Sequence, residues 1–421
     1  MVPGATGPCR ALGAVSRPLS AVPLSRSALS AVWGPGLLVM IADADAGNIV
    51  TAAQSGAAWG YRLLPLLLVL IPPLFMVQEL AVRLGLATGL GFGELVRNRL
   101  GPAWACVCGV VLMLAVFGTL VTEFTGIAGV GEMYGLSRSV SLPLASLGLV
   151  FILLSGRYRR VERIALVIGA FELVFLFVAW QAHPSGTALL ADLADIPLGE
   201  RSFLFLGAAM IGATFSPWMI FFHQSAVAEK RLGPEHVTVT RWETAAGAAL
   251  TQILTACVLV ASAATIGTTN RFQPLDTVGE ISQALTPFFG VEMGRLLFGG
   301  GVVAASMMAA VVSSMAGIWG VAELFGLQRS HTGRRRHRFH LAYAGAVAAA
   351  AALTWGVTNL VQLNLAAQVA NAVLLPVLIA TVILLAATAL PPAVRLHGWY
   401  LWLVTGVCSA IGVAGLLGAT G

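Results

Sequence analysis

Polar side chains of the kind that bind cations interrupt an otherwise apolar stretch of this chain. The stretch reads MIADADAGNIVTAAQSG over residues 40–56 and contains Asp43, Asp45 and Asn48. Carboxylate and amide oxygens are ligands for hard divalent cations. Ionisable groups within an apolar membrane helix are costly and mark ion or substrate pathways. These residues are therefore a candidate ion site.

A second apolar stretch, GAAMIGATFSPWMIFFHQSAVAEK over residues 207–230, carries Ser216 and Pro217 near its centre. Proline removes a backbone donor and clashes with the preceding helical turn. In the first stretch, Gly47 is expected to allow backbone angles that other residues resist. Both helices are therefore predicted to be broken near their middle, although a simple kink at Pro217 is the alternative.

The elements that must position these residues are membrane helices. The chain has 421 residues, of which 58% are hydrophobic and 10% are charged, whereas soluble domains carry about 25% charged residues. A spanning helix needs roughly 20 apolar residues. The sequence predicts an all-α polytopic membrane protein with eleven spans, at about 34–57, 61–82, 103–129, 139–156, 162–182, 202–227, 243–267, 290–326, 340–357, 361–391 and 397–419.

The basic residues indicate how these spans are oriented. Most of the 24 Lys and Arg residues fall on alternate connections if the N-terminus lies in the cytoplasm, as the positive-inside rule requires. The net charge of +6 is thereby explained without a nucleic-acid partner. Residues 1–32 are predicted to be a disordered cytoplasmic tail, and 33–421 the membrane domain with an extracytoplasmic C-terminus.

The two predicted breaks lie five spans apart, as they would in two five-helix repeats. We expect repeats at about 33–182 and 202–391, followed by an extra helix at about 397–419. A repeated Gln-Ser pair, a local echo between the halves, agrees with two repeats: Gln54-Ser55 follows the first break and Gln224-Ser225 follows the second. Interrupted segments at matching places in two halves indicate the binding site of a secondary transporter.

The runs GPGLLVMIADADAGNIVTAAQSGAAWGYRLL and MVQELAVRLGLATGLGFGELVRNRLG resemble the first two spans of the NRAMP family of divalent metal transporters. The family signature Asp-Pro-Gly-Asn stands here as Asp45-Ala46-Gly47-Asn48. Its sixth-span signature, Ala-Thr-x-Met-Pro-His, stands here over residues 213–218 as ATFSPW. The resemblance covers roughly residues 33–390. It implies a LeuT-like 5+5 inverted repeat with broken helices one and six, and metal held between them.

Carried over by position, the resemblance implies a set of metal-binding groups. They are the Asp45 carboxylate, the Asn48 amide oxygen, the Ala213 carbonyl, Ser216 at a methionine position, Gln368 and, less directly, Asn371. Together with the reading of the residues themselves, it gives a second set expected beside the ion or along its pathway: Asp43, Gly47, Gln54, Glu123, Pro217, Trp218, His223 and Gln224.

Ser216 is the departure that bears on the substrate. A thioether is a soft ligand that favours transition metals, whereas a hydroxyl is hard. Mg²⁺ keeps several waters and binds through one or two carboxylates, so the sequence favours Mg²⁺ with Mn²⁺ tolerated. A tryptophan after the sixth-span proline, here Trp218, also resembles the bacterial branch of NRAMP-related magnesium transporters. That branch implies an inner-membrane location.

Other departures concern protons. The family usually has a histidine at the position of Trp218 and a second acidic residue at the position of Gly126. Glu123 keeps the first acidic position, and His223 matches another family histidine. We therefore expect import without proton coupling, with a proton-coupled Mn²⁺/Fe²⁺ carrier as the alternative. Glu172, inside the fifth span, is expected to be paired or protonated, with a functional role as the alternative.

Two other classes of function fit less well. Ser216, His223 and Asp45 are the residue types of a hydrolase triad, but no nucleophile-elbow motif is present. An amino-acid transporter of the same fold would offer helix N-termini to a carboxylate, which Asp45 would repel. We expect a transporter rather than an enzyme, with the metal ion and the bilayer as partners and no resident cofactor; the sequence does not indicate the oligomeric state.

Overall fold

The computed structural model describes residues 34–154, 169–266, 275–286, 290–326, 334–391 and 398–420. The predicted N-terminal tail lies outside these residues. Every regular element that the structure describes is a helix, which confirms the all-α class.

The helices of the first half are α2 (Pro35–Ile41), α3 (Ala46–Trp59), α4 (Leu64–Thr88), α5 (Phe92–Met133), α6 (Arg138–Leu154), η1 (Ala170–Leu173), α8 (Val174–Gln181) and α9 (Gly186–Ala194). Those of the second half are α10 (Arg201–Thr214), α11 (Trp218–Glu229), η2 (Pro234–His236), α12 (Val237–Thr265), α13 (Val278–Leu285), α14 (Val291–Leu324), α15 (Arg334–Gly356), α16 (Leu360–Ala389) and α17 (Gly398–Thr420).

Length and composition qualify many of these helices as membrane spans. Within the described residues, six are long and apolar enough, or eight if two bent pairs each count as one span, and three shorter apolar helices accompany them. Large apolar side chains point outward on several of them, with Leu144 69%, Phe151 76% and Trp402 78% exposed. Such a surface is compatible with lipid rather than water.

The third predicted span, at 103–129, agrees with the part of α5 that follows Gly101. A φ of 86° at Gly101 breaks the helix there, and the segment from Phe92 to Leu100 precedes the break. The fifth span, predicted at 162–182, is described only from Gly169 onward.

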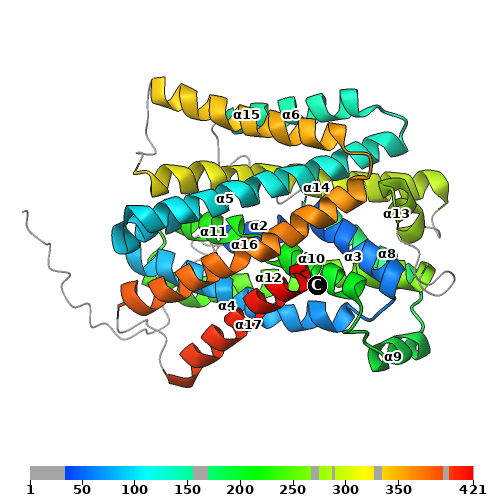
Figure 1. The fold of residues 1–421 in the computed structure, drawn as a ribbon, viewed down its shortest axis with the longest axis horizontal. Helices are drawn as coiled ribbons and strands as arrows, with labels where there is room; N and C mark the ends of the chain where they lie inside the picture. Colours follow the sequence, from blue (N-terminus) through cyan, green and yellow to red (C-terminus); the bar gives the residue numbers. More distant parts are fainter. Residues whose placement is uncertain are drawn as a thin grey trace, which may run out of the picture.

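The broken helices occupy the centre of the bundle. The residues of α3 from Ala46 to Ala57 are buried, and so are those of α11 from Trp218 to Val227. Figure 1 shows α6 and α15 side by side along one edge, with α5 and α14 next to them, while α17 lies at the opposite side against α16. The long helices therefore shield the broken ones.

Candidate ion-binding site between two broken helices

The first break lies at residues 42–45, where the α2–α3 pair bends by 45°. The Asp43 N–H donates to the Met40 carbonyl at 3.2 Å, which ends α2 in a tight turn. Asp45 then caps α3, because its Oδ1 accepts the Asn48 N–H at 2.8 Å. The other oxygen, Oδ2, is buried and receives no hydrogen-bond donor. One Asp45 oxygen thus holds the helix and the other is free to bind an ion.

The second break frees a backbone carbonyl. In a continuous helix, residue 217 would donate its N–H to the Ala213 carbonyl, but Pro217 has no N–H. The Asn48 side-chain nitrogen takes that place, 3.1 Å from the Ala213 oxygen. The same amide also donates to the Asp43 carbonyl. Asn48 therefore links the two breaks, although they are 165 residues apart in sequence.

Gly47 is needed for a different reason from the predicted one. It lies in the first turn of α3 and its φ is not positive, so the prediction of unusual backbone angles is wrong. A Cβ at this position would overlap the Gln368 side-chain nitrogen and lie 3.0 Å from Asp45 Oδ1. The missing side chain lets Gln368 of α16 pack against the first turn of α3, beside the capping carboxylate.

Helix α16 contributes two amides on one side. Gln368 and Asn371 are each 1% exposed, and Asn371 Nδ2 donates to Gln368 Oε1 at 3.1 Å. A Cβ at Gly212 of α10 would overlap the Gln368 carbonyl, so α10 and α16 approach through their backbones. The structure thus brings Asp45, Asn48, Ala213 and Gln368 together, while Asn371 joins through Gln368.

Ser216 and Trp218 flank the proline of the second break. Both side chains are buried, and neither the Ser216 hydroxyl nor the Trp218 indole N–H has a hydrogen-bond partner. The Ser216 carbonyl accepts the Met219 N–H at 3.0 Å, which starts α11. An unpartnered buried hydroxyl is costly, so Ser216 is free to bind an ion or its water.

Glu123 of α5 faces the start of α3. Its Oε2 accepts the Ala46 N–H at 3.4 Å, which places the Glu123 carboxyl group next to Asp45, the N-cap of the same helix. At Gly126 a Cβ would lie 2.6 Å from Ala46 Cβ and 2.8 Å from Ser306 Oγ. The position of the family's second acid therefore has no room for any side chain.

His223 lies away from this constellation. Its Nδ1 is 3.1 Å from Gln78 Oε1 on α4. Its Nε2 would be 3.3 Å from a Cβ at Gly36, near the start of α2, and the Glu243 carboxylate lies at the same place. His223 thus belongs to the packing at the other end of α2 from the break.

Gln54 and Gln224 bond to main-chain atoms at matching places in the two halves. Gln54 Oε1 accepts the Leu275 N–H at 2.8 Å, just before α13. Gln224 Nε2 donates to the Leu90 carbonyl at 3.1 Å, just before α5. Each therefore holds the backbone that precedes a helix of the other half.

Two further buried glutamates, which are not among the predicted site residues, accept hydrogen bonds from N–H groups at the starts of helices. Glu243 of α12 accepts the N–H groups of Gly34 at 2.6 Å and Leu37 at 3.0 Å, at the start of α2. Glu323 of α14 accepts the Gly93 N–H at 3.1 Å, at the start of α5. A carboxylate suits the positive end of a helix, and an isolated Glu near the end of an apolar span is the signal that points to such a role.

A third set of polar contacts links the connection after α3 to α9. The Tyr61 N–H donates to Asp192 Oδ2 at 3.0 Å, and Arg62 pairs with Asp192 at 3.4 Å and Asp195 at 3.2 Å. Burial raises the pKa of the Tyr61 phenol, and the Asp192 charge adds to the shift. These contacts fix the end of the first span that lies opposite Glu243.

In the part of the chain that the structure describes, acidic, His and Cys side chains do not by themselves make a metal centre. Among the described residues no three of them are grouped as metal ligands, so an ion at Asp45 depends on carbonyl, amide and hydroxyl oxygens.

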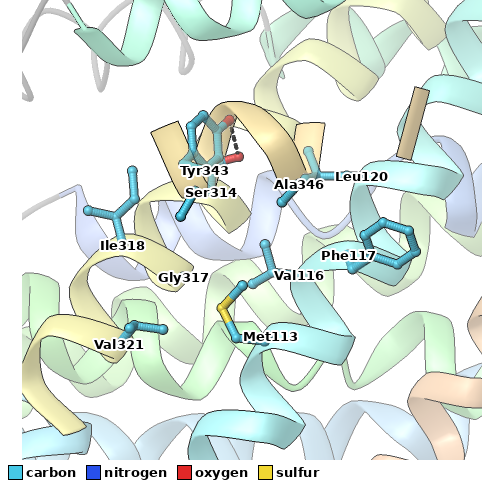
Figure 2. A pocket seen from close by; sticks show the side chains of 11 residues that line it. Met113, Val116, Phe117, Leu120, Ser314, Gly317, Ile318, Val321, Tyr343 and Ala346 are labelled. Atoms are coloured by element: carbon cyan, nitrogen blue, oxygen red, sulfur yellow. Dashed lines mark hydrogen bonds between the residues drawn. The ribbon is translucent and has the colours of Figure 1, made fainter. Parts of the chain in front are cut away.

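A cavity of about 110 Å³ lies between α5, α14 and α15, separate from the site at Asp45 (Figure 2). Its lining is apolar except where Tyr343 donates to Ser314 at 2.7 Å, which excludes it as an ion site.

A buried polar site between two broken helices, inside a bundle of apolar spans, defines a class: a polytopic membrane transporter. The family model described as natural resistance-associated macrophage protein-like, Nramp, matches residues 36–419. The chain belongs to the NRAMP family, whose members are membrane transporters and not enzymes.

Relatives and solved structures agree with this assignment. The divalent metal cation transporter MntH 1 of Pseudomonas aeruginosa is 28% identical over 316 residues, covering 72% of this chain and 71% of that protein. MntH of Yersinia pestis is 29% identical over 317 residues, covering 73% and 75%.

Two solved structures share the fold. The manganese transporter of Eremococcus coleocola superposes with a TM-score of 0.73 at 20% identity, covering 93% of this chain and 88% of that one. MhsT in complex with L-phenylalanine superposes with a TM-score of 0.63 at 12% identity, covering 91% and 97%. These likenesses confirm the LeuT-like fold with broken first and sixth spans.

Proposed function

We propose that this protein imports divalent metal ions by alternating access, with Mg²⁺ as the leading substrate, Mn²⁺ as a second one, and no coupling to protons. The observation that carries the proposal is the Asp45 carboxylate, which is 1% exposed and has one oxygen without a donor. It lies where Asn48 and Ala213 join the two breaks. A charged oxygen buried among neutral ones suits a cation.

The relatives support the general part of this proposal. Those named above are divalent metal cation transporters, and one solved neighbour is a manganese transporter. The ion would be held by Asp45, by the Ala213 carbonyl, and by Asn48 and Gln368 with their amide oxygens turned inward. One carboxylate among neutral oxygen ligands binds a hard cation without cancelling all of the cation's charge.

Ser216 supports the preference for Mg²⁺. Its buried, unpartnered hydroxyl stands where the family supplies a sulfur, and it is smaller than methionine. A hard oxygen donor with room for water suits an ion that sheds its waters reluctantly. Gly126 supports uncoupled transport, because the space for a second acid is filled by Ala46 and Ser306.

The proposal is tested by metal uptake into proteoliposomes. Excess Mg²⁺ is expected to compete with Mn²⁺ uptake by the wild-type protein, and Ser216→Met is expected to weaken that competition. Mn²⁺ uptake that is indifferent to a large excess of Mg²⁺ would contradict the magnesium preference.

A proton-coupled Mn²⁺/Fe²⁺ carrier is the second candidate, and the position of Glu123 next to Asp45 favours it. A metal ion arriving at Asp45 would displace a proton held by this pair. A pH-sensitive dye inside the proteoliposomes separates the two candidates. Uncoupled transport predicts no metal-dependent acidification of the lumen, and coupled transport predicts acidification that Glu123→Gln removes.

The orientation is part of the proposal. The distribution of Lys and Arg supports a cytoplasmic N-terminus and an extracytoplasmic C-terminus in a bacterial inner membrane. Under this topology Glu243 holds α2 near the cytoplasmic face, and the Arg62 pairs lie near the outer face.

A further inference from the structure

Two buried carboxylates beside the proposed transport site receive no hydrogen bond. Asp43, in the first break, and Glu172, in η1, are each 0% exposed. Both oxygens of each side chain lack a partner. Buried carboxylates are normally paired or bonded to donors, because leaving them bare is very costly. A retained proton or a bound cation must therefore offset each charge in the folded protein.

The packing places Glu172 next to the first break. Gly169, one turn before it, lies so close to Ile41 at the end of α2 that a Cβ would overlap the Ile41 side chain. The same Cβ would be 3.2 Å from the Met308 sulfur on α14. Glu172 shares this face of its helix, so its side chain is directed toward the α2 end, two residues before Asp43.

The charges of these side chains act on one another. Asp43, Asp45 and Glu172 lie close enough for their carboxylates to repel one another when they are ionised. None of the ion pairs that the structure describes includes Asp43 or Glu172, so neither has a basic partner among them. A divalent ion at Asp45 carries one charge more than that carboxylate, so one negative charge on Asp43 and Glu172 is left to be matched when all three groups are ionised.

We propose that Asp43 and Glu172 form a second cation site, beside the transport site at Asp45, for a small hard cation bound through carboxylate oxygens. Na⁺ and a second divalent ion share this chemistry. A cation there reduces the negative charge close to Asp45, so its occupancy changes the affinity for the transported ion, and the effect is reciprocal. This inference goes beyond the proposed function, and the following experiment separates the two.

The experiment measures the thermal midpoint of the full-length protein in detergent, in metal-free choline chloride. The Asp45→Ala variant serves as background, because it removes the transport site. Na⁺ or Mg²⁺ is then titrated at constant ionic strength. A cation that binds only the folded state raises the midpoint with concentration. We expect one of these cations to stabilise Asp45→Ala, and Asp45→Ala/Glu172→Gln to lose that stabilisation.

Glu292→Gln in the same background is the matched control, because it removes an exposed carboxylate at the start of α14; the cation response should persist. In cation-free buffer Glu172→Gln should be no less stable than its parent, since it removes a bare buried charge. Should Glu172→Gln not fold, Asp43→Asn tests the same site.

Stabilisation of Asp45→Ala by Na⁺ alone identifies a monovalent site, and stabilisation by Mg²⁺ identifies a second divalent site; both support the proposal. No response to either cation, or a response that survives Glu172→Gln and Asp43→Asn, overturns it. The proposed function is judged separately, by whether wild-type protein binds Mg²⁺ or Mn²⁺ at Asp45. Either site can therefore fail while the other stands.

Discussion

At the scale of single residues, Asp45 has two separable tasks. Its Oδ1 caps α3 by accepting the Asn48 N–H, and its charge is what an ion would bind. Asn is about as good an N-cap as Asp, so one substitution can keep the cap and remove the charge. Stability and ion binding can thus be measured apart at this position.

We predict that Asp45→Asn abolishes metal uptake while changing the free energy of unfolding by less than about 1 kcal/mol. Asp45→Ala should abolish uptake and also lose about 1 kcal/mol, because Ala cannot cap. Uptake assays and denaturation in detergent measure the two effects. Retained uptake by Asp45→Asn would show that the carboxylate charge does not hold the ion.

Gly47 supports a second prediction at this scale. Gly47→Ala forces its new methyl group into Gln368, and overpacking of this kind costs about 1–3 kcal/mol. We expect lower thermal stability and impaired uptake. Gln368→Ala should recover the stability of Gly47→Ala, because it removes the overlapping group.

Gly186→Ala is the control for this prediction, since no atom lies within 4 Å of a Cβ at Gly186. It should leave stability and uptake unchanged. Equal effects of Gly47→Ala and Gly186→Ala would mean that the close approach of Gln368 is not what requires glycine.

At the scale of helices, the ends of the broken and kinked spans are held by glutamates from distant helices. Glu243 fastens α2 and Glu323 fastens α5, where Glu323 also accepts the Ser225 hydroxyl at 2.8 Å. The short helix α2 has few hydrogen bonds of its own, so it depends on this contact. Moving α2 requires breaking the bonds to Glu243.

We therefore predict that Glu243→Ala accelerates hydrogen–deuterium exchange of the amides of α2, because the Gly34 and Leu37 N–H groups lose their acceptor. Exchange across α16 should not change. Glu292→Ala, on an exposed residue, should leave α2 as protected as in the wild type. Unaltered exchange of α2 in Glu243→Ala would contradict a holding role.

The helical elements show which features a sequence reveals. Spans are local properties of apolar content, and Pro217 and the two aspartates mark the breaks locally, so both are predictable. The contact from Glu243 to Gly34 joins residues 209 positions apart, and no local pattern encodes it. Gly47 shows the same limit: the glycine is visible, but the side chain that fills its space comes from α16.

At the scale of the whole molecule, the two halves contact one another in matching ways. Gln54 holds the backbone before α13, and Gln224 holds the backbone before α5. These exchanged contacts support the proposed inverted repeats, and they explain why the Gln-Ser echo in the sequence follows both breaks. In such an arrangement the site between the breaks can face either side of the membrane in turn.

Anomalous X-ray scattering from crystals grown with Mn²⁺ measures the position of the transported ion directly. We predict an anomalous peak within coordination distance of Asp45 and the Ala213 carbonyl, with Asn48 beside it. That peak should weaken when Mg²⁺ is added in excess and disappear in Asp45→Asn. A peak elsewhere, or one that persists in Asp45→Asn, would show that the Asp45 carboxylate does not hold the ion.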